Sequence, residues 1–131
     1  MDFNLKVGMT AQKSETVTHD NTAVKYGSGG VAVYATPAMI GLMEGTCLNA
    51  VDPHLPAGLA TVGTHLDVRH LAATPVGMTV RAEARLTAIN GKKLSFTVEA
   101  FDEAEKIGEG THERYIIDLA KFLQKTAAKQ S

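Results

Sequence analysis

Residues 36–48 read TPAMIGLMEGTCL, a segment of helical length whose one charged residue is Glu44. A helix that is apolar on nearly all sides is normally buried. Burying a carboxylate costs about 2–7 kcal/mol or more unless the group is paired, hydrogen-bonded or neutralised. Glu44 therefore needs a specific reason to lie in this segment. We interpret it as a candidate catalytic residue; the alternative is a structural carboxylate that accepts hydrogen bonds from the backbone.

The residues that flank this segment predict where the helix begins and ends. Thr36 is a suitable N-cap. Pro37 then fits the first helical position, where the N–H that proline lacks would have no partner. The helix is predicted to end before Asp52-Pro53, because a residue that precedes proline is displaced from the α-helical region.

The second half of the chain predicts three consecutive antiparallel strands. Apolar residues occupy alternate positions through much of 78–89 and again in 94–100, which is the period of a strand with one buried face. Asn90-Gly91 lies between these segments and suits a two-residue hairpin turn with positive φ angles. A polar turn at 102–105 leads to a third predicted strand at 107–118.

Weaker signals complete the predicted fold. Strands are expected at residues 10–17 and 60–71, a mobile loop at 19–30, and a short surface helix at 119–129. One strand, one apolar helix and four antiparallel strands predict an α+β fold. In this fold an antiparallel sheet of about five strands wraps around one long central helix.

Composition limits the organisation, location and partners of the chain. With 131 residues, 44% of them hydrophobic, the chain is expected to form one domain over residues 1–131. A net charge of −1 without blocks of like charge gives no footprint for nucleic acid or an acidic membrane surface. The N-terminus lacks a signal-peptide pattern, and no apolar run reaches the roughly 20 residues of a membrane span, so we expect a cytoplasmic protein. Cys47, the one cysteine, lies among apolar residues and is expected to be an inert core residue.

The segment HLAATPVGM at residues 70–78 adds a more specific signal. Together with the helix that carries Glu44 and the long alternating strand, it resembles the hotdog-fold acyl-CoA thioesterases. The order and spacing of Thr36, Glu44 and His70 are similar to the Thr, Glu and His triad of the fluoroacetyl-CoA thioesterase group within that superfamily. The similarity extends to Gly63 and Arg114.

This resemblance covers about residues 7–118 and implies a function. It implies a hotdog fold, a homodimer that often associates further, and active sites at the subunit interface. It also implies hydrolysis of an acyl-CoA to free acid and CoA without a metal or an organic cofactor.

The resemblance also implies roles for individual residues. Thr36, Glu44 and His70 would be catalytic, with Glu44 either attacking the thioester carbonyl or activating water. Free N–H groups at the helix N-terminus would stabilise the oxyanion. Gly63 and Arg114 would bind substrate; their alternatives are a β-bulge for Gly63 and a surface ion pair for Arg114.

Helix geometry constrains this triad. Glu44 follows Thr36 by eight residues, which places them about 12 Å apart along the axis of one straight helix. That distance is too long for a hydrogen bond. We therefore predict that Glu44 approaches Thr36 and His70 of the other subunit, or that Thr36 lies on a bend before the helix.

One segment departs from the family pattern. The fluoroacetyl-specific enzyme carries an aromatic gate before the helix, whereas residues 27–33 are glycine-rich here and Gly30 occupies the gate position. We therefore expect a short-chain or otherwise small acyl-CoA as substrate rather than strict selectivity for fluoroacetate.

The sequence leaves one main alternative function open and disfavours two other possibilities. A non-catalytic acyl-CoA binding or sensing module on the same fold is the main alternative. A hotdog hydratase is disfavoured because its Asp and His motif is not found on the helix segment. A metal site is disfavoured because the residues that would form it lack a recognised ligand spacing: His65, Asp67, His112 and Glu113.

Overall fold

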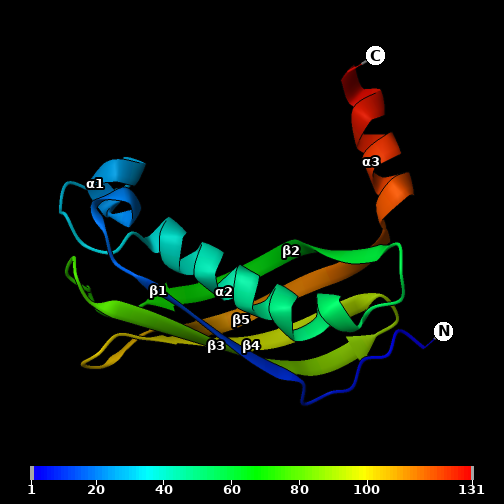
Figure 1. The fold of residues 1–131 in the computed structure, drawn as a ribbon, viewed down its shortest axis with the longest axis horizontal. Coiled ribbons are helices and arrows are strands. Elements are labelled where there is room, and N and C mark those ends of the chain that lie inside the picture. Colours follow the sequence, from blue (N-terminus) through cyan, green and yellow to red (C-terminus); the bar gives the residue numbers. More distant parts are fainter. Residues whose placement is uncertain (1, 131) are drawn as a thin grey trace.

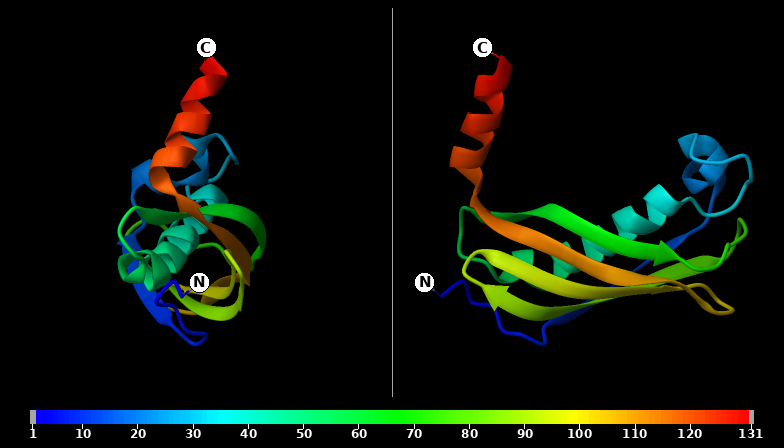
Figure 2. Two further views of the ribbon diagram at one scale, coloured as in Figure 1. Left: turned by 90° about the vertical axis from the view of Figure 1, so that its right-hand side faces the viewer. Right: turned by 180° about the vertical axis from the view of Figure 1, so that it is seen from behind.

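The computed structural model, which describes residues 2–130, consists of a five-stranded antiparallel sheet curled around one long helix (Figure 1). The strands are β1 (Thr10–Thr16), β2 (Leu59–His70), β3 (Thr79–Asn90), β4 (Lys93–Phe101) and β5 (Lys106–Asp118). Their order across the sheet is β1-β3-β4-β5-β2. The helix α2 (Thr36–Val51) lies along the concave side, as the end-on view in Figure 2 shows. The predicted α+β hotdog architecture is confirmed.

Helix α2 buries one side against the sheet and leaves the other side open to solvent in the single chain. The residues on its buried side are Ala38, Met39, Leu42, Met43, Thr46, Cys47, Ala50 and Val51. They share a core with the inward-facing residues of the strands, among them Val80, Leu86 and Phe96. Thr36 and Leu48 are exposed, and Glu44 is half-buried at the boundary between the two sides.

The start of α2 differs by one position from the sequence prediction. Ala35 is the N-cap, and Thr36 and Pro37 are the first two helical residues. The hydroxyl of Thr36 is hydrogen-bonded to His70 rather than to the helix backbone, so no side chain caps the N-terminus of α2. The predicted C-terminus is confirmed, because the α-helix ends at Val51 and a 3-10 turn, Asp52–His54, follows.

The β3–β4 turn is also displaced by one residue from its prediction. Asn90 pairs with Lys93, so the two turn residues are Gly91 and Lys92. Gly91 has φ +62° and occupies the first turn position, where a two-residue hairpin of the II′ type places glycine.

The segment predicted as a mobile loop contains regular structure. Thr18 caps a 3-10 turn, η1 (His19–Asn21), and the hydroxyl of Thr22 accepts a hydrogen bond from the backbone of Lys25 in α1 (Ala23–Tyr26).

The predicted C-terminal helix is confirmed as α3 (Leu119–Ala127), which projects away from the sheet (Figure 1, Figure 2). None of the helices within residues 2–130 has the length and apolar character that a membrane crossing requires.

Strands β2 and β5 approach so closely that Gly110 has no room for a side chain. Gly110 is paired with Val68. A Cβ added to Gly110 would lie 2.2 Å from the backbone oxygen of Asp67 and 2.6 Å from the Cα of Val68. Because both atoms belong to the backbone of the neighbouring strand, a rotamer change cannot relieve the clash.

We predict that Gly110→Ala lowers the free energy of unfolding by about 1–3 kcal/mol, because it forces β2 and β5 apart. Urea denaturation of the variant and the wild type measures the difference. Gly30→Ala is the control, because a Cβ at residue 30 would meet no atom within 4 Å. Equal stability of Gly110→Ala and the wild type would contradict the prediction.

Candidate active site

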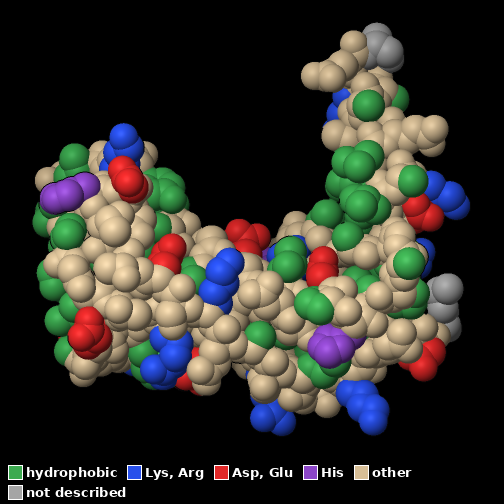
Figure 3. All heavy atoms as spheres, viewed as in Figure 1, with side chains coloured by type: hydrophobic (Ala, Val, Ile, Leu, Met, Phe, Trp, Pro, Cys, Tyr) green, Lys and Arg blue, Asp and Glu red, His purple; other side chains and the backbone are tan. Residues whose placement is uncertain are grey.

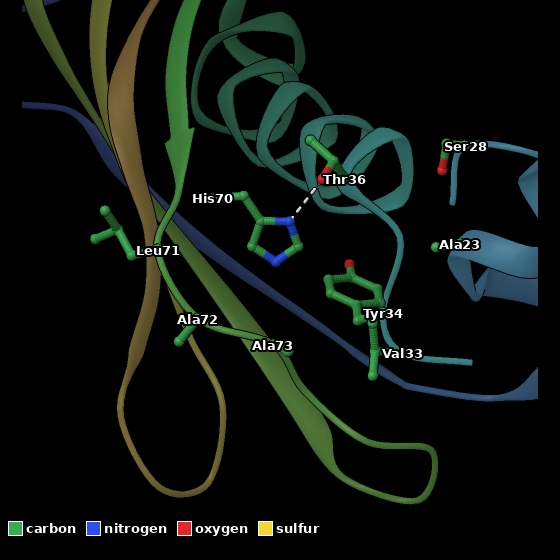
Figure 4. A pocket seen from close by; sticks show the side chains of 9 residues that line it. All are labelled: Ala23, Ser28, Val33, Tyr34, Thr36, His70, Leu71, Ala72 and Ala73. Carbon is green, nitrogen blue, oxygen red and sulfur yellow. Dashed lines mark hydrogen bonds between the residues drawn. The ribbon is translucent and has the colours of Figure 1, made fainter. Parts of the chain in front are cut away.

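Thr36 and His70 form a hydrogen-bonded pair where α2 begins and β2 ends. The Thr36 hydroxyl and Nδ1 of His70 lie 2.7 Å apart (Figure 4). The first turn of α2 fixes Thr36, and the end of β2 fixes His70. Two of the three predicted catalytic residues are therefore in contact within one chain.

The other nitrogen of this imidazole has no partner. Nε2 of His70 is buried and makes no hydrogen bond within residues 2–130. Burial lowers the pKa of His70 below its ordinary value of 6.5, while the nearby backbone of Ala72 acts in the opposite direction. His70 is thus held as a neutral imidazole near neutral pH, the form that can accept a proton.

The pair borders a cavity of about 330 Å³. Most of its lining side chains are small or apolar, and they come from α1, the segment before α2, and the segment after β2 (Figure 4): Ala23, Ser28, Val33, Tyr34, Leu71, Ala72 and Ala73. Tyr34 is hydrogen-bonded to Glu15. Burial and this carboxylate raise the pKa of Tyr34, so its phenol stays protonated.

Glu44 belongs to a second cluster, against the middle of β2. A Cβ at Gly63 would lie 2.8 Å from Oε2 of Glu44, 3.1 Å from Cε1 of His112 and 3.5 Å from Nη1 of Arg114. Because residue 63 is glycine and has no side chain, the Glu44 carboxylate has room beside β2. Within residues 2–130, Glu44 has no hydrogen bond or ion pair, so its carboxylate remains available to a ligand or a partner.

The structure shows where the two predicted substrate-binding residues lie: the alternative of a bulge is observed for Gly63, and the alternative of a surface ion pair is not observed for Arg114. The pairing of β2 with β5 shifts register between Gly63 and His65, so Gly63 lies at a bulge and also beside Glu44. Arg114 is 5% exposed and is not a surface ion pair. It donates from Nε to the hydroxyl of Thr61 at 2.7 Å and from Nη2 to the carbonyl of Thr61 at 3.0 Å.

His112 is a buried neighbour of Arg114 that sequence reasoning did not place in this site. Its Nδ1 lies 2.8 Å from the carbonyl oxygen of His65, and its Nε2 lies 3.2 Å from Nη1 of Arg114. A carbonyl accepts and a guanidinium donates, so Nδ1 carries the proton and Nε2 accepts. Burial lowers the pKa of His112, which agrees with a neutral ring.

The two clusters are separate in the single chain. Thr36 lies on the first turn of α2 rather than on a bend before it, so the bend offered as an alternative is not observed. Glu44 lies two turns further along the same helix, beside Gly63 instead of beside His70.

Two kinds of site that the sequence disfavours, a cysteine nucleophile and a metal site, can be compared with the structure. Cys47 is fully buried, and burial raises the pKa of its thiol to about 12, so it is not a thiolate nucleophile near neutral pH. Among residues 2–130, no three His, Cys, Asp or Glu side chains are grouped so that they could hold a metal ion.

Comparisons with known proteins agree with this fold and arrangement. The family model described as fluoroacetyl-CoA-specific thioesterase matches residues 17–120. A fluoroacetyl-CoA thioesterase from Streptantibioticus cattleyicolor is 46% identical over 97 residues, which cover 74% of this chain and 70% of that protein.

Solved structures give the same result. The fluoroacetyl-CoA thioesterase FlK is 38% identical with a TM-score of 0.89, over 95% of this chain and 97% of that chain. A thioesterase superfamily member from Thermus thermophilus is 31% identical with a TM-score of 0.88, over 95% and 93% of the two chains. The fold and the matches define a hotdog-fold thioesterase. More particularly, the chain belongs to the fluoroacetyl-CoA-specific thioesterase family, which confirms the resemblance found in the sequence.

The lowered pKa values of His70 and His112 predict how stability depends on pH. Below pH 6.5 the unfolded chain binds protons at these residues more readily than the folded chain does, so unfolding becomes more favourable as the pH falls. Above that range both states are neutral at these residues, and their effect disappears.

We therefore expect the free energy of unfolding to fall between pH 7 and pH 5, and to fall less in His70→Asn, which cannot titrate at that position. Urea denaturation at each pH measures both slopes. The carboxylates contribute equally to the pH dependence of both proteins, so the difference between the two slopes reports the titration of His70. An equal or steeper fall in the variant would contradict the assignment.

Proposed function

We propose that the protein hydrolyses a small acyl-CoA to the free acid and CoA, using Thr36, Glu44 and His70. The observation that carries this proposal is the hydrogen bond between Thr36 and His70 at the edge of a cavity of about 330 Å³. Membership of a thioesterase family supports the reaction type. A structure of a variant of the related enzyme FlK in complex with acetyl-CoA, 36% identical over 97% of this chain, supports a small acyl group.

In the proposed reaction the thioester carbonyl lies at the N-terminus of α2. No side chain caps this end of the helix, so its N–H groups are available to stabilise the developing oxyanion. Glu44 either attacks the carbonyl carbon, forming an anhydride that water then cleaves to release the acid and free Glu44, or takes a proton from a water that attacks the carbonyl directly. The carbon–sulfur bond breaks, one water is consumed, and the CoA thiolate leaves with a proton that His70 and Thr36 help to deliver.

The segment before α2 favours a broad small-acyl specificity. Gly30 has no side chain, and a Cβ there would meet no atom within 4 Å, so the position is open. An aromatic gate at this position, as in the fluoroacetyl-specific relative, is therefore replaced by free space. We propose that the enzyme accepts short acyl groups without strict selection for a fluorinated one.

We further propose that the active unit is a homodimer formed through β2. This strand is at the edge of the sheet, where unpaired backbone groups can pair with another strand. Figure 3 shows a hollow above the body of the molecule, between the α1 end and the projecting α3. Both elements that bound this hollow carry exposed apolar side chains: Val24 and Tyr26 on α1, and Leu119, Phe122 and Leu123 on α3.

A two-fold axis at this edge would cover the exposed apolar side chains at both ends of the hollow. In such a dimer the same surface is used twice, so α3 of one copy approaches α1 of the other. The same rotation runs the two α2 helices in opposite directions. Glu44 of one copy then approaches Thr36 and His70 of the second copy, which the distance along one helix prevents within a single chain.

The function is tested by thiol release from a panel of acyl-CoAs of increasing chain length. We expect wild-type turnover on the shortest members and a loss of at least about a hundredfold in Glu44→Gln, because the variant lacks a nucleophile or base of comparable strength. Acyl-CoA affinity, measured by calorimetry, is expected to change little. Thiol release that is absent in the wild type, with binding retained, would instead indicate the binding or sensing module.

The shared site is tested by mixing two inactive variants, Glu44→Gln and His70→Asn. If each site takes Glu44 from one copy and His70 from the other, a mixed dimer has one intact site and one site with both changes. Random exchange of subunits then restores about a quarter of wild-type activity. If both residues acted within one copy, every site would remain damaged and mixing would restore nothing. Sedimentation of the mixture verifies that dimers form.

A further inference from the structure

The buried guanidinium of Arg114 is held in part by Thr61, which is in turn hydrogen-bonded to Asp52; neither Thr61 nor Asp52 has yet been assigned a role in the site. Thr61, on β2, receives two hydrogen bonds from Arg114, one on its hydroxyl and one on its carbonyl. Thr61 is itself 5% exposed. Its hydroxyl donates to one carboxylate oxygen of Asp52 at 2.5 Å, and its backbone N–H donates to the other at 3.1 Å.

These contacts leave part of the guanidinium free. Arginine has five N–H donors, and three of those of Arg114 are used by Thr61 and His112. The remaining two have no acceptor within residues 2–130. Nη1 and the Glu44 carboxylate both lie within 3.5 Å of the position that a Cβ of Gly63 would occupy.

These contacts fix which group donates and which accepts in each hydrogen bond around Arg114. His112 is neutral and accepts from Arg114 through Nε2. The hydroxyl of Thr61 accepts from Nε and has one proton of its own, which it gives to Asp52. Asp52, at the C-terminal end of α2, thereby orders the hydroxyl without contacting Arg114 directly.

We propose that Asp52 and Thr61 are positioning residues of the thioesterase site: they fix Arg114 so that Nη1, with its one free N–H, stays at the space above Gly63 that the Glu44 carboxylate also borders. This role rests on the proposed function and adds two residues to it. A buried cation that is hydrogen-bonded on one edge presents its other edge in a fixed direction. Without Thr61 the guanidinium loses both the acceptor of Nε and its link to Asp52.

The test compares thiol release by Thr61→Val, Thr61→Ser and the wild type. Valine has the shape of threonine without the hydroxyl, and hydrogen bonds to charged groups are strong, so we expect kcat/KM to fall about tenfold to a hundredfold in Thr61→Val. Thr61→Ser keeps the hydroxyl and is expected to be several-fold more active than Thr61→Val. Thr87→Val is the matched control, because that hydroxyl bonds to the backbone of Ser95, on a strand pair outside the site.

A double-mutant cycle separates positioning from a loss of packing. If Thr61 acts through Arg114, then Thr61→Val has less than about a twofold further effect on kcat/KM in an Arg114→Lys background. A purely structural role would give the same loss in both backgrounds and would overturn the proposal. Should Thr61→Val fail to fold, Asp52→Asn replaces it, with a smaller loss of kcat/KM that also disappears in the Arg114→Lys background.

The outcomes distinguish this proposal from the function on which it rests. A wild type that releases no thiol from any acyl-CoA overturns both. An active wild type with an equally active Thr61→Val overturns the positioning role alone. An active wild type, an impaired Thr61→Val and a partly restored Thr61→Ser, together with the cycle, support the role.

Discussion

The distance between Thr36 and Glu44 along α2 is the constraint on which the arrangement of the site depends. The helix is fixed by apolar contacts with the sheet along one side, so it cannot bend to bring the two residues together. Thr36 meets His70 at one end, and Glu44 meets the space above Gly63 two turns later. Each chain thus carries two incomplete halves of the proposed triad. A second copy is the simplest way to unite them.

The half-site around Glu44 is held by polar groups that the fold can bury because each finds a partner. Arg114 would be costly to bury alone, but Thr61 and His112 take three of its N–H groups. The neutral state of His112 follows from the same contacts, because a protonated ring would oppose the guanidinium. Gly63 completes the arrangement, since any side chain there would meet Glu44. These contacts hold the polar groups of this half-site in one fixed arrangement.

The sequence predicts the features that depend on local patterns. Alternation predicts β3 and β4, β-branched and aromatic residues after a polar turn predict β5, and the Asp52-Pro53 pair predicts the end of α2. Features that depend on contacts between distant segments are predicted one residue away from their observed position or are not predicted at all. Thr36 is not the N-cap, because its hydroxyl bonds to His70. Thr61 looks like an ordinary strand residue in sequence, and His112 is considered there only as a disfavoured metal ligand. The contact of Thr61 with Arg114 requires the β2–β5 register and the bulge after Gly63, which periodicity does not determine.

The size of the cavity limits what each half of the site can do. About 330 Å³ is at the lower end of the range of small-molecule pockets, which is about 300–1,000 Å³. Such a space suits an acyl group and its thioester, whereas the nucleotide of CoA would extend over the surface. In the proposed reaction the His70 half would therefore hold the reacting carbonyl at the start of α2. The Glu44 half would add the carboxylate and the Arg114 cation from across the interface. Binding and chemistry would then both depend on association, because neither half has all the groups that the reaction needs.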